Sequence, residues 1–78
     1  MKFEVKVMPK PEALDPQGRA VHGALHRLGF AVLDCRIGKN IIVELPDEAG
    51  EQGIDEVKKM AEKILANPLI EIYEVRKI

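Results

Sequence analysis

The chain has very little of several things that stabilise small proteins. Its 78 residues include one cysteine, no tryptophan, one tyrosine and two phenylalanines. A single cysteine cannot form an intrachain disulfide, and a domain of this size buries only about 60% of its unfolded surface. Small domains without disulfides or a structural metal often gain stability by oligomerisation. We therefore expect a single domain, residues 1–78, that self-associates as a homodimer or tetramer.

Neither sign of charge dominates. The 12 basic and 13 acidic residues are mixed along the chain and give a formal net charge of −1. Proteins that bind nucleic acid or anionic lipid need a basic face. No apolar run approaches the roughly 20 residues that span a bilayer, and the chain opens on an alternating charged stretch rather than an apolar signal segment. We expect no nucleic-acid or membrane partner, and a cytoplasmic location.

The first half of the chain predicts a strand followed by a helix. Residues 2–8 alternate between apolar and charged side chains, the period of a strand with one face in water. Pro9 and Pro11 end this strand because proline has no backbone N–H. Asp15-Pro16 is a typical helix start, since the Asp side chain can accept backbone N–H groups and proline suits the first helical position. Gly29 is placed to end the helix.

The second half predicts a hairpin, a helix and a last strand. Residues 30–37 and 40–45 are rich in β-branched and large apolar residues, and Gly38-Lys39 between them predicts a tight turn with a positive φ at Gly38. Residues 46–53 are a predicted loop. A helix follows, marked by apolar residues at helical spacing and ended by Asn67-Pro68. Residues 69–75 carry apolar side chains on both faces of a predicted final strand.

This order predicts an α+β fold. Strand, helix, strand, strand, helix, strand (β-α-β-β-α-β) gives two layers: a mainly antiparallel four-stranded sheet with two helices on one face. The opposite face of the sheet is left open, and a second copy of the chain is one way to cover it.

No group of residues forms a complete metal or catalytic motif. His22 and His26 share one helix face, which is half of a helical zinc site, but no carboxylate or cysteine pair completes it. A role on the surface or at an interface is favoured for both, and no metal is expected. Cys35 lies in a β-rich run, where core packing is more common than catalysis.

Two glycine-containing segments are interpreted as structural features. Gly38-Lys39 lacks the upstream glycine and the following Ser or Thr of a phosphate-binding loop, so it is interpreted as a turn. Gly18 stands in the first turn of the predicted helix, where it costs nearly 1 kcal/mol of helix propensity relative to alanine. We infer that some group approaches the backbone closely at Gly18.

Three segments together resemble a known family. They are the helix start Leu14-Asp15-Pro16-Gln17-Gly18 followed by Ala20-Val21 and Ala24-Leu25, the run Arg36-Ile37-Gly38-Lys39, and the run Leu65-Ala66-Asn67-Pro68-Leu69-Ile70-Glu71 followed by Tyr73-Glu74-Val75. In this order and over nearly the whole chain, they are similar to the PurS family, the small subunit of phosphoribosylformylglycinamidine (FGAM) synthase.

The resemblance implies a role in purine biosynthesis. In that family a glutaminase subunit releases ammonia and a large synthetase subunit converts formylglycinamide ribonucleotide (FGAR) to FGAM. PurS-type dimers join the two. It implies no catalytic residue and no cofactor in this chain, with ATP and magnesium on the large synthetase subunit.

The hypothesis for the site is a set of partner contacts rather than a catalytic centre. The open sheet face and the final strand are expected to form the homo-oligomer, while the helix start and the Gly38-Lys39 turn face the synthetase and glutaminase subunits. The predicted partner-interface residues are Asp15, Gln17, Gly18, Arg36, Gly38, Lys39, Asn67 and Tyr73. The alternative is a small dimeric ligand-sensing module, since α+β dimers of this size often bind small molecules between subunits.

Overall fold

The computed structural model describes residues 1–78 and has a three-stranded antiparallel sheet at its centre. Strand β1 (Lys2–Pro9) lies between β2 (Lys39–Glu44) and β3 (Glu71–Lys77), in the order β2-β1-β3. Helix α1 (Pro16–Arg27) follows β1. A 3-10 helix, η1 (Asp47–Gln52), leads into α2 (Gly53–Met60), whose last turn continues as the π-helical η2 (Ala61–Leu65). None of these helices has the length and apolar character that crossing a membrane requires.

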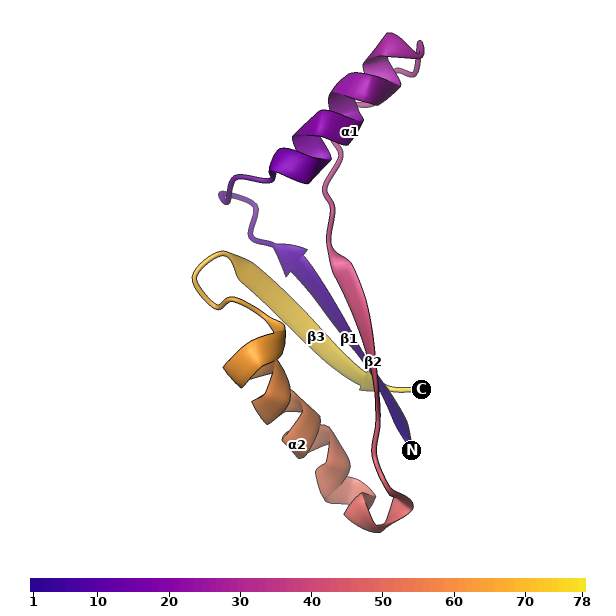
Figure 1. Cartoon of the computed structure of the whole chain (residues 1–78), viewed down its shortest axis with the longest axis vertical. Helices are drawn as coiled ribbons and strands as arrows, with labels where there is room; N and C mark the ends of the chain where they lie inside the picture. Colours follow the sequence, from indigo (N-terminus) through magenta and orange to yellow (C-terminus); the bar gives the residue numbers. More distant parts are fainter.

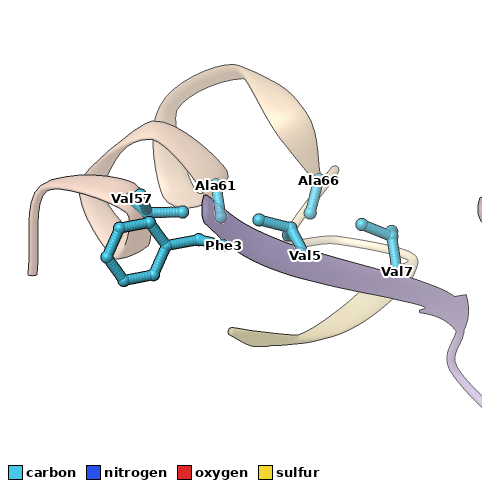
Figure 2. Close-up of a cluster of buried hydrophobic side chains, with 6 residues drawn as sticks. All are labelled: Phe3, Val5, Val7, Val57, Ala61 and Ala66. Carbon is cyan, nitrogen blue, oxygen red and sulfur yellow. The ribbon is translucent and has the colours of Figure 1, made fainter. Parts of the chain in front are cut away.

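The core lies between one face of the sheet and α2. Phe3, Val5 and Val7 alternate along β1 and are fully buried, as the period-two pattern predicts. They pack against three small or β-branched side chains of the second helical region, Val57, Ala61 and Ala66, which Figure 2 shows above β1. Each of the fully buried valines contributes about 1.5–3 kcal/mol relative to an exposed position. This cluster holds α2 to the sheet.

The opposite face of the sheet is open and mixed: charged residues of β1 lie there beside Ile42 of β2 and Ile72 of β3, both exposed. Its β1 residues are Lys2, Glu4, Lys6 and Met8, none of which is buried. Glu4 accepts a hydrogen bond from Arg76 Nε of β3 at 2.9 Å and another from Asn40 Nδ2 at 3.1 Å. The expectation of a wet sheet face is therefore confirmed for the single chain.

Helix α1 begins and ends as predicted, but it does not cover the sheet. Asp15 is its N-cap, Pro16 its first residue, and Gly29 follows its end with a φ of 92°. The helix extends beyond the end of the sheet, away from both chain termini (Figure 1). The radius of gyration is 15.8 Å, whereas a compact chain of this length has about 11–12 Å.

The prediction of two helices on one face is thus wrong, for a reason of size. The outer strands of a three-stranded sheet lie about 10 Å apart, which is close to the diameter of one helix. Helix α2 already covers the buried residues of β1, so one face of this narrow sheet has no room for α1.

The predicted hairpin and the fourth strand are also wrong. Residues 30–37 form no strand, and β2 is an edge strand that pairs only with the central β1, from Lys2 opposite Glu44 to Val7 opposite Lys39. Part of segment 30–37 is bonded to α1 instead: Phe30 N donates to Leu25 O at 3.0 Å. Gly38 has no positive φ, so it is not a hairpin turn. The last strand starts at Glu71 rather than residue 69, after a turn in which Ile70 N and Glu71 N both donate to Asn67 O.

Candidate interaction site at the neck

Two segments of chain join α1 to the sheet, and they run side by side. One is residues 10–15, which leave β1, and the other is residues 34–38, which return toward β2 (Figure 1). We call these two segments the neck. The predicted site residues Asp15 and Arg36 lie in it, one on each segment.

The Asp15 carboxylate accepts hydrogen bonds from both directions. Its Oδ1 accepts from the backbone N–H of Gly18 at 2.9 Å, which caps α1. Its Oδ2 accepts from the backbone N–H of Ile37, also at 2.9 Å, although Ile37 is 22 residues away in sequence. One side chain therefore ties the start of α1 to the segment that enters β2.

Arg36 holds the other segment of the neck. Its Nη2 donates to Lys10 O at 2.6 Å and its Nη1 donates to Pro11 O at 3.3 Å. Its Nε is 3.9 Å from Asp15 Oδ2, a long ion pair. Lys10 N in turn donates to Ile70 O at 2.8 Å, which connects the neck to the turn before β3.

Two glycines allow the chain to pack closely at the neck. Gly18 is buried, and a Cβ placed on it would lie 2.5 Å from Cys35 O and would also collide with the Asp15 carboxylate. A Cβ on Gly38 would collide with Val7 O and Met8 Sδ. The close approach that the sequence predicted at Gly18 thus comes from the neck of the same chain. Gly38 likewise lets the chain approach β1 closely, and the sequence did not predict this contact.

The hydrogen bonds of the neck lower the pKa of Asp15. The N–H of Ile37 has the largest effect and the N–H of Gly18 the next, because both stabilise the charged carboxylate; Arg36 adds to the effect. The pKa of Glu4 on the open sheet face is lowered as well, first by the hydrogen bond from Asn40 and then by that from Arg76. The contacts of the folded chain therefore stabilise both carboxylates in their charged form.

The structure brings part of the predicted site together. Asp15, Gly18, Arg36 and Gly38 lie at the neck, and the exposed Gln17 and Lys39 flank it on α1 and β2. The remaining two residues belong to the β3 side of the molecule. Asn67 Oδ1 accepts from Leu69 N at 3.0 Å and so shapes the turn before β3, while Tyr73 is an exposed residue of β3 opposite Val7.

The histidines hold the chain that returns from α1. His22 Nε2 lies 2.7 Å from Val32 O and His26 Nε2 lies 3.0 Å from the same oxygen. Their rings meet edge to face with centroids 4.6 Å apart. The shared carbonyl was not predicted, although the four-residue spacing predicted a shared helix face. No third His, Cys, Asp or Glu joins them.

Cys35 is not a core residue, which corrects the prediction. It is half-buried in the neck and lies outside the hydrophobic cluster. Its apolar neighbours in sequence suggested a strand, but the neck takes its backbone out of the sheet.

The hollows on the surface are shallow. One of about 440 Å³ lies on the open face of the sheet between Glu4, Lys6, Met8 and the start of β2. A second, of about 350 Å³, lies at the neck beside Asp15, Cys35 and Arg36. Both are open to solvent, whereas small-molecule sites usually enclose most of the ligand surface. These hollows give the ligand-sensing alternative no support.

Comparison with known proteins finds similarity along the whole chain. The family described as "PurS: Phosphoribosylformylglycinamidine (FGAM) synthase" matches residues 2–78. The chain is 47% identical to the PurS subunit of this synthase from Bacillus subtilis over 74 residues, covering 92% of this chain and 86% of that protein. It is 36% identical to the Thermotoga maritima subunit over 78 residues, with coverage of 99% and 95%.

Solved structures agree with the sequence comparison. A chain of the T. maritima PurLQS structure superimposes with a TM-score of 0.86 at 36% identity, covering 99% of this chain and 95% of that one. The PurS structure from Methanocaldococcus jannaschii, a subunit of formylglycinamide ribonucleotide amidotransferase, gives 0.82 at 37% identity, with coverage of 96% and 92%. The similarity thus includes α1, the neck and the sheet together.

Proposed function

This chain belongs to the PurS family of FGAM synthase, and we propose that it joins the large synthetase and the glutaminase of that ligase without supplying a catalytic residue. The synthase acts in purine biosynthesis, where it converts FGAR to FGAM with glutamine and ATP. The observation that carries the proposal is the match, over almost the full length of both chains, to a chain of the T. maritima PurLQS complex. In this proposal the synthetase binds ATP and Mg²⁺, and the complex acts in the cytoplasm.

The shape of the molecule supports a connecting role. It measures 51 × 24 × 14 Å, and its two ends offer different surfaces, α1 at one and the α2-covered sheet at the other (Figure 1). A protein that must contact two larger chains at once benefits from such separated surfaces. The exposed side chains of Gln17 and Lys39 lie between them, beside the neck.

A second copy of the chain is the proposed cover for the far end of α1. We call Leu28, Phe30 and Leu33 the α1 tip; they are 74%, 57% and 99% exposed. Gly18 is the only buried residue of α1, and an isolated helix of 12 residues is marginally stable in water. On the open sheet face, by contrast, Glu4 already pairs with Arg76, and the apolar residues Ile42 and Ile72 are each about half exposed. We therefore favour the α1 tip over the sheet face for self-association.

The test of the connecting role is reconstitution with the synthetase and glutaminase of the same organism. We expect glutamine-dependent FGAM formation only when all three chains are mixed, co-elution of the three on size-exclusion chromatography, and no turnover by this chain alone. Full glutamine-dependent activity from the two larger chains without this one would contradict the proposal.

Lys39 offers the cleanest test of a predicted contact residue. Its side chain is exposed and in no ion pair, whereas Arg36 supports the neck, so that replacing Arg36 would also disturb the fold. We expect Lys39→Glu to weaken binding to the larger subunits by about fivefold or more, since an interfacial charge of the wrong sign is repelled. The measurement is titration calorimetry, with the exposed Lys63→Glu of η2 as a charge-matched comparison; a larger loss of binding in Lys39→Glu than in Lys63→Glu is the result expected if Lys39 contacts a partner.

A further inference from the structure

Helix α1 is attached to the rest of the molecule almost entirely through the neck. It has no extensive contact with a strand or with α2. Side chains from α1 do not enter the core cluster, which consists of β1 and the α2 region with Ala66. The direction in which α1 extends from the sheet must therefore be fixed by the contacts of residues 10–15 with residues 34–38.

We propose that Asp15 is a positioning residue that fixes the orientation of α1 relative to the sheet, because its two carboxylate oxygens bind the start of α1 and the entrance of β2 at the same time. This inference deepens the proposed function. If the chain joins two larger subunits, Asp15 sets the geometry between the surfaces that do so, rather than contacting a partner itself.

The bonding requires a carboxylate at this position. Gly18 and Ile37 both present a backbone N–H donor, at 2.9 Å from Oδ1 and Oδ2 respectively. Because the two donors reach different oxygens of the side chain, both of these atoms must be acceptors, as they are in a carboxylate. Asparagine has one acceptor oxygen, and its NH₂ group would face an N–H donor. A simple helix cap would need only the first of these bonds.

The rest of the neck is arranged around this carboxylate. Arg36 binds Lys10 O and Pro11 O, which keeps the two neck segments together. Gly18 has no side chain where Cys35 O approaches, so the returning segment can come close enough for Ile37 N to reach Asp15. Among these neck residues, Asp15 is the one whose side chain binds both α1, at Gly18, and the segment that enters β2, at Ile37.

The experiment compares Asp15→Asn with Asp34→Asn in the full chain. Asn is a good N-cap, so α1 should still form in the first variant. Asp34 is an exposed neck carboxylate that accepts only from its neighbour Cys35 N, which makes Asp34→Asn a matched control. Spin labels at Arg27→Cys and Lys58→Cys, in a Cys35→Ser background, report the distance from the end of α1 to α2. Dilution with unlabelled chain keeps the measured distances within one chain.

In the Asp15→Asn variant we expect a broadened distance distribution and at least tenfold faster hydrogen exchange at Ile37 N–H, with exchange at Val5 N–H unchanged. Asp34→Asn should leave all three readouts as in the wild type. A second variant, Asp15→Ser, keeps one cap acceptor and loses the other, and it must behave like Asp15→Asn. An unchanged distance distribution overturns the inference. Faster exchange at Val5 N–H in both Asp15→Asn and Asp15→Ser also overturns the inference, because Asp15 would then support the whole fold rather than the orientation of α1.

Binding to the larger subunits separates this inference from the proposed function. We expect Asp15→Asn to bind them at least fivefold more weakly than the wild type and Asp34→Asn to bind equally well. Equal binding by Asp15→Asn, despite a broadened distribution, overturns the role of the orientation in assembly. Failure of the wild type to bind would refute the proposed function. The distance measurements on the isolated chain would still test whether Asp15 fixes the orientation of α1.

Discussion

At the scale of single residues, Gly18 and Gly38 are required for close packing and not for a positive φ. The two glycines with positive φ are Gly29 and Gly50, and neither has an atom near its missing Cβ. Gly18 and Gly38 instead lie where another part of the chain approaches the backbone. A glycine in a sequence does not show which of these two needs it meets, so Gly38 was mistaken for a turn residue.

Replacing Gly38 by alanine should destabilise the protein. The new methyl group would collide with Val7 O and Met8 Sδ at the end of β1, and overpacking of this kind costs about 1–3 kcal/mol. Gly23→Ala is the control, because the nearest atom to its Cβ is Arg27 Nη1 at 3.5 Å, and alanine in a helix is favoured by about 0.5–1 kcal/mol. Urea denaturation at one fixed protein concentration measures both. Equal stability of the two variants would contradict the packing of Gly38.

Stability should fall in acid because the pKa values of Glu4 and Asp15 are lowered in the folded chain. A carboxyl group with a lower pKa in the folded state stabilises that state when ionised. This contribution is complete above the pKa of the unfolded chain, about 4, and is lost as pH falls through that value toward the lower folded one.

Glu4 provides the variant that tests this pH dependence. Glu4→Gln should lower stability at pH 7 and make the decrease between pH 6 and pH 3 shallower, as measured by urea midpoints. Glu62→Gln, in which the replaced carboxylate is exposed and in no ion pair, should leave the profile unchanged. If the stability of Glu4→Gln depended on pH as that of the wild type does, Asn40 and Arg76 would not stabilise the charged form of Glu4.

At the scale of elements, α1 and α2 are stabilised differently. Helix α2 buries Val57, and η2 buries Ala61, against the sheet, while α1 buries only Gly18. We expect backbone amides in the middle of α1, such as Ala24 N–H, to exchange with solvent much faster than Val5 N–H in dilute protein. Their protection should rise with protein concentration as a second copy covers the α1 tip. Residue-resolved hydrogen exchange at two concentrations measures this, and equal protection in dilute samples would contradict it.

Much of the element order could be predicted because the signals are local. The alternation of residues 2–8, the cap at Asp15-Pro16 and the stop at Gly29 each depend on a few neighbouring residues, and all three are confirmed. The pairing of strands could not be predicted in this way. Residues 30–37 have strand-like composition, but the start of this segment is bonded to α1: Phe30 N donates to Leu25 O, and Val32 O is bound by the two histidines.

The neck could be predicted only in part, for a similar reason. Asp15 was correctly predicted as a cap, because its bond to Gly18 N spans three residues. Its second bond, to Ile37 N, joins residues far apart in sequence and leaves no local pattern. Arg36 likewise has no sequence signal for its contacts with Lys10 and Pro11. Whether the eight predicted interface residues contact a partner stays a prediction.

At the scale of the whole molecule, the exposed apolar surface is large for a chain of this size. Twelve large hydrophobic residues are exposed, while the core cluster has six members. A small domain has a narrow margin of stability, so the cover supplied by a second copy should add measurably to it. The α1 tip gathers three of these exposed residues at the end of a helix that lies beyond the sheet (Figure 1).

Thermal unfolding should therefore depend on protein concentration. If the dimer unfolds to separated chains, tenfold dilution removes about 1.4 kcal/mol and should lower Tm by about 3–5 °C. Leu33→Glu places a charge in the α1 tip and should give a monomer with a lower Tm that dilution does not change. Ile64→Glu replaces a side chain that is 82% exposed on η2 and should behave like the wild type. Ile72→Glu tests the open sheet face: if it abolishes the concentration dependence and Leu33→Glu does not, the dimer forms through the sheet, and α1 remains free to bind the larger subunits.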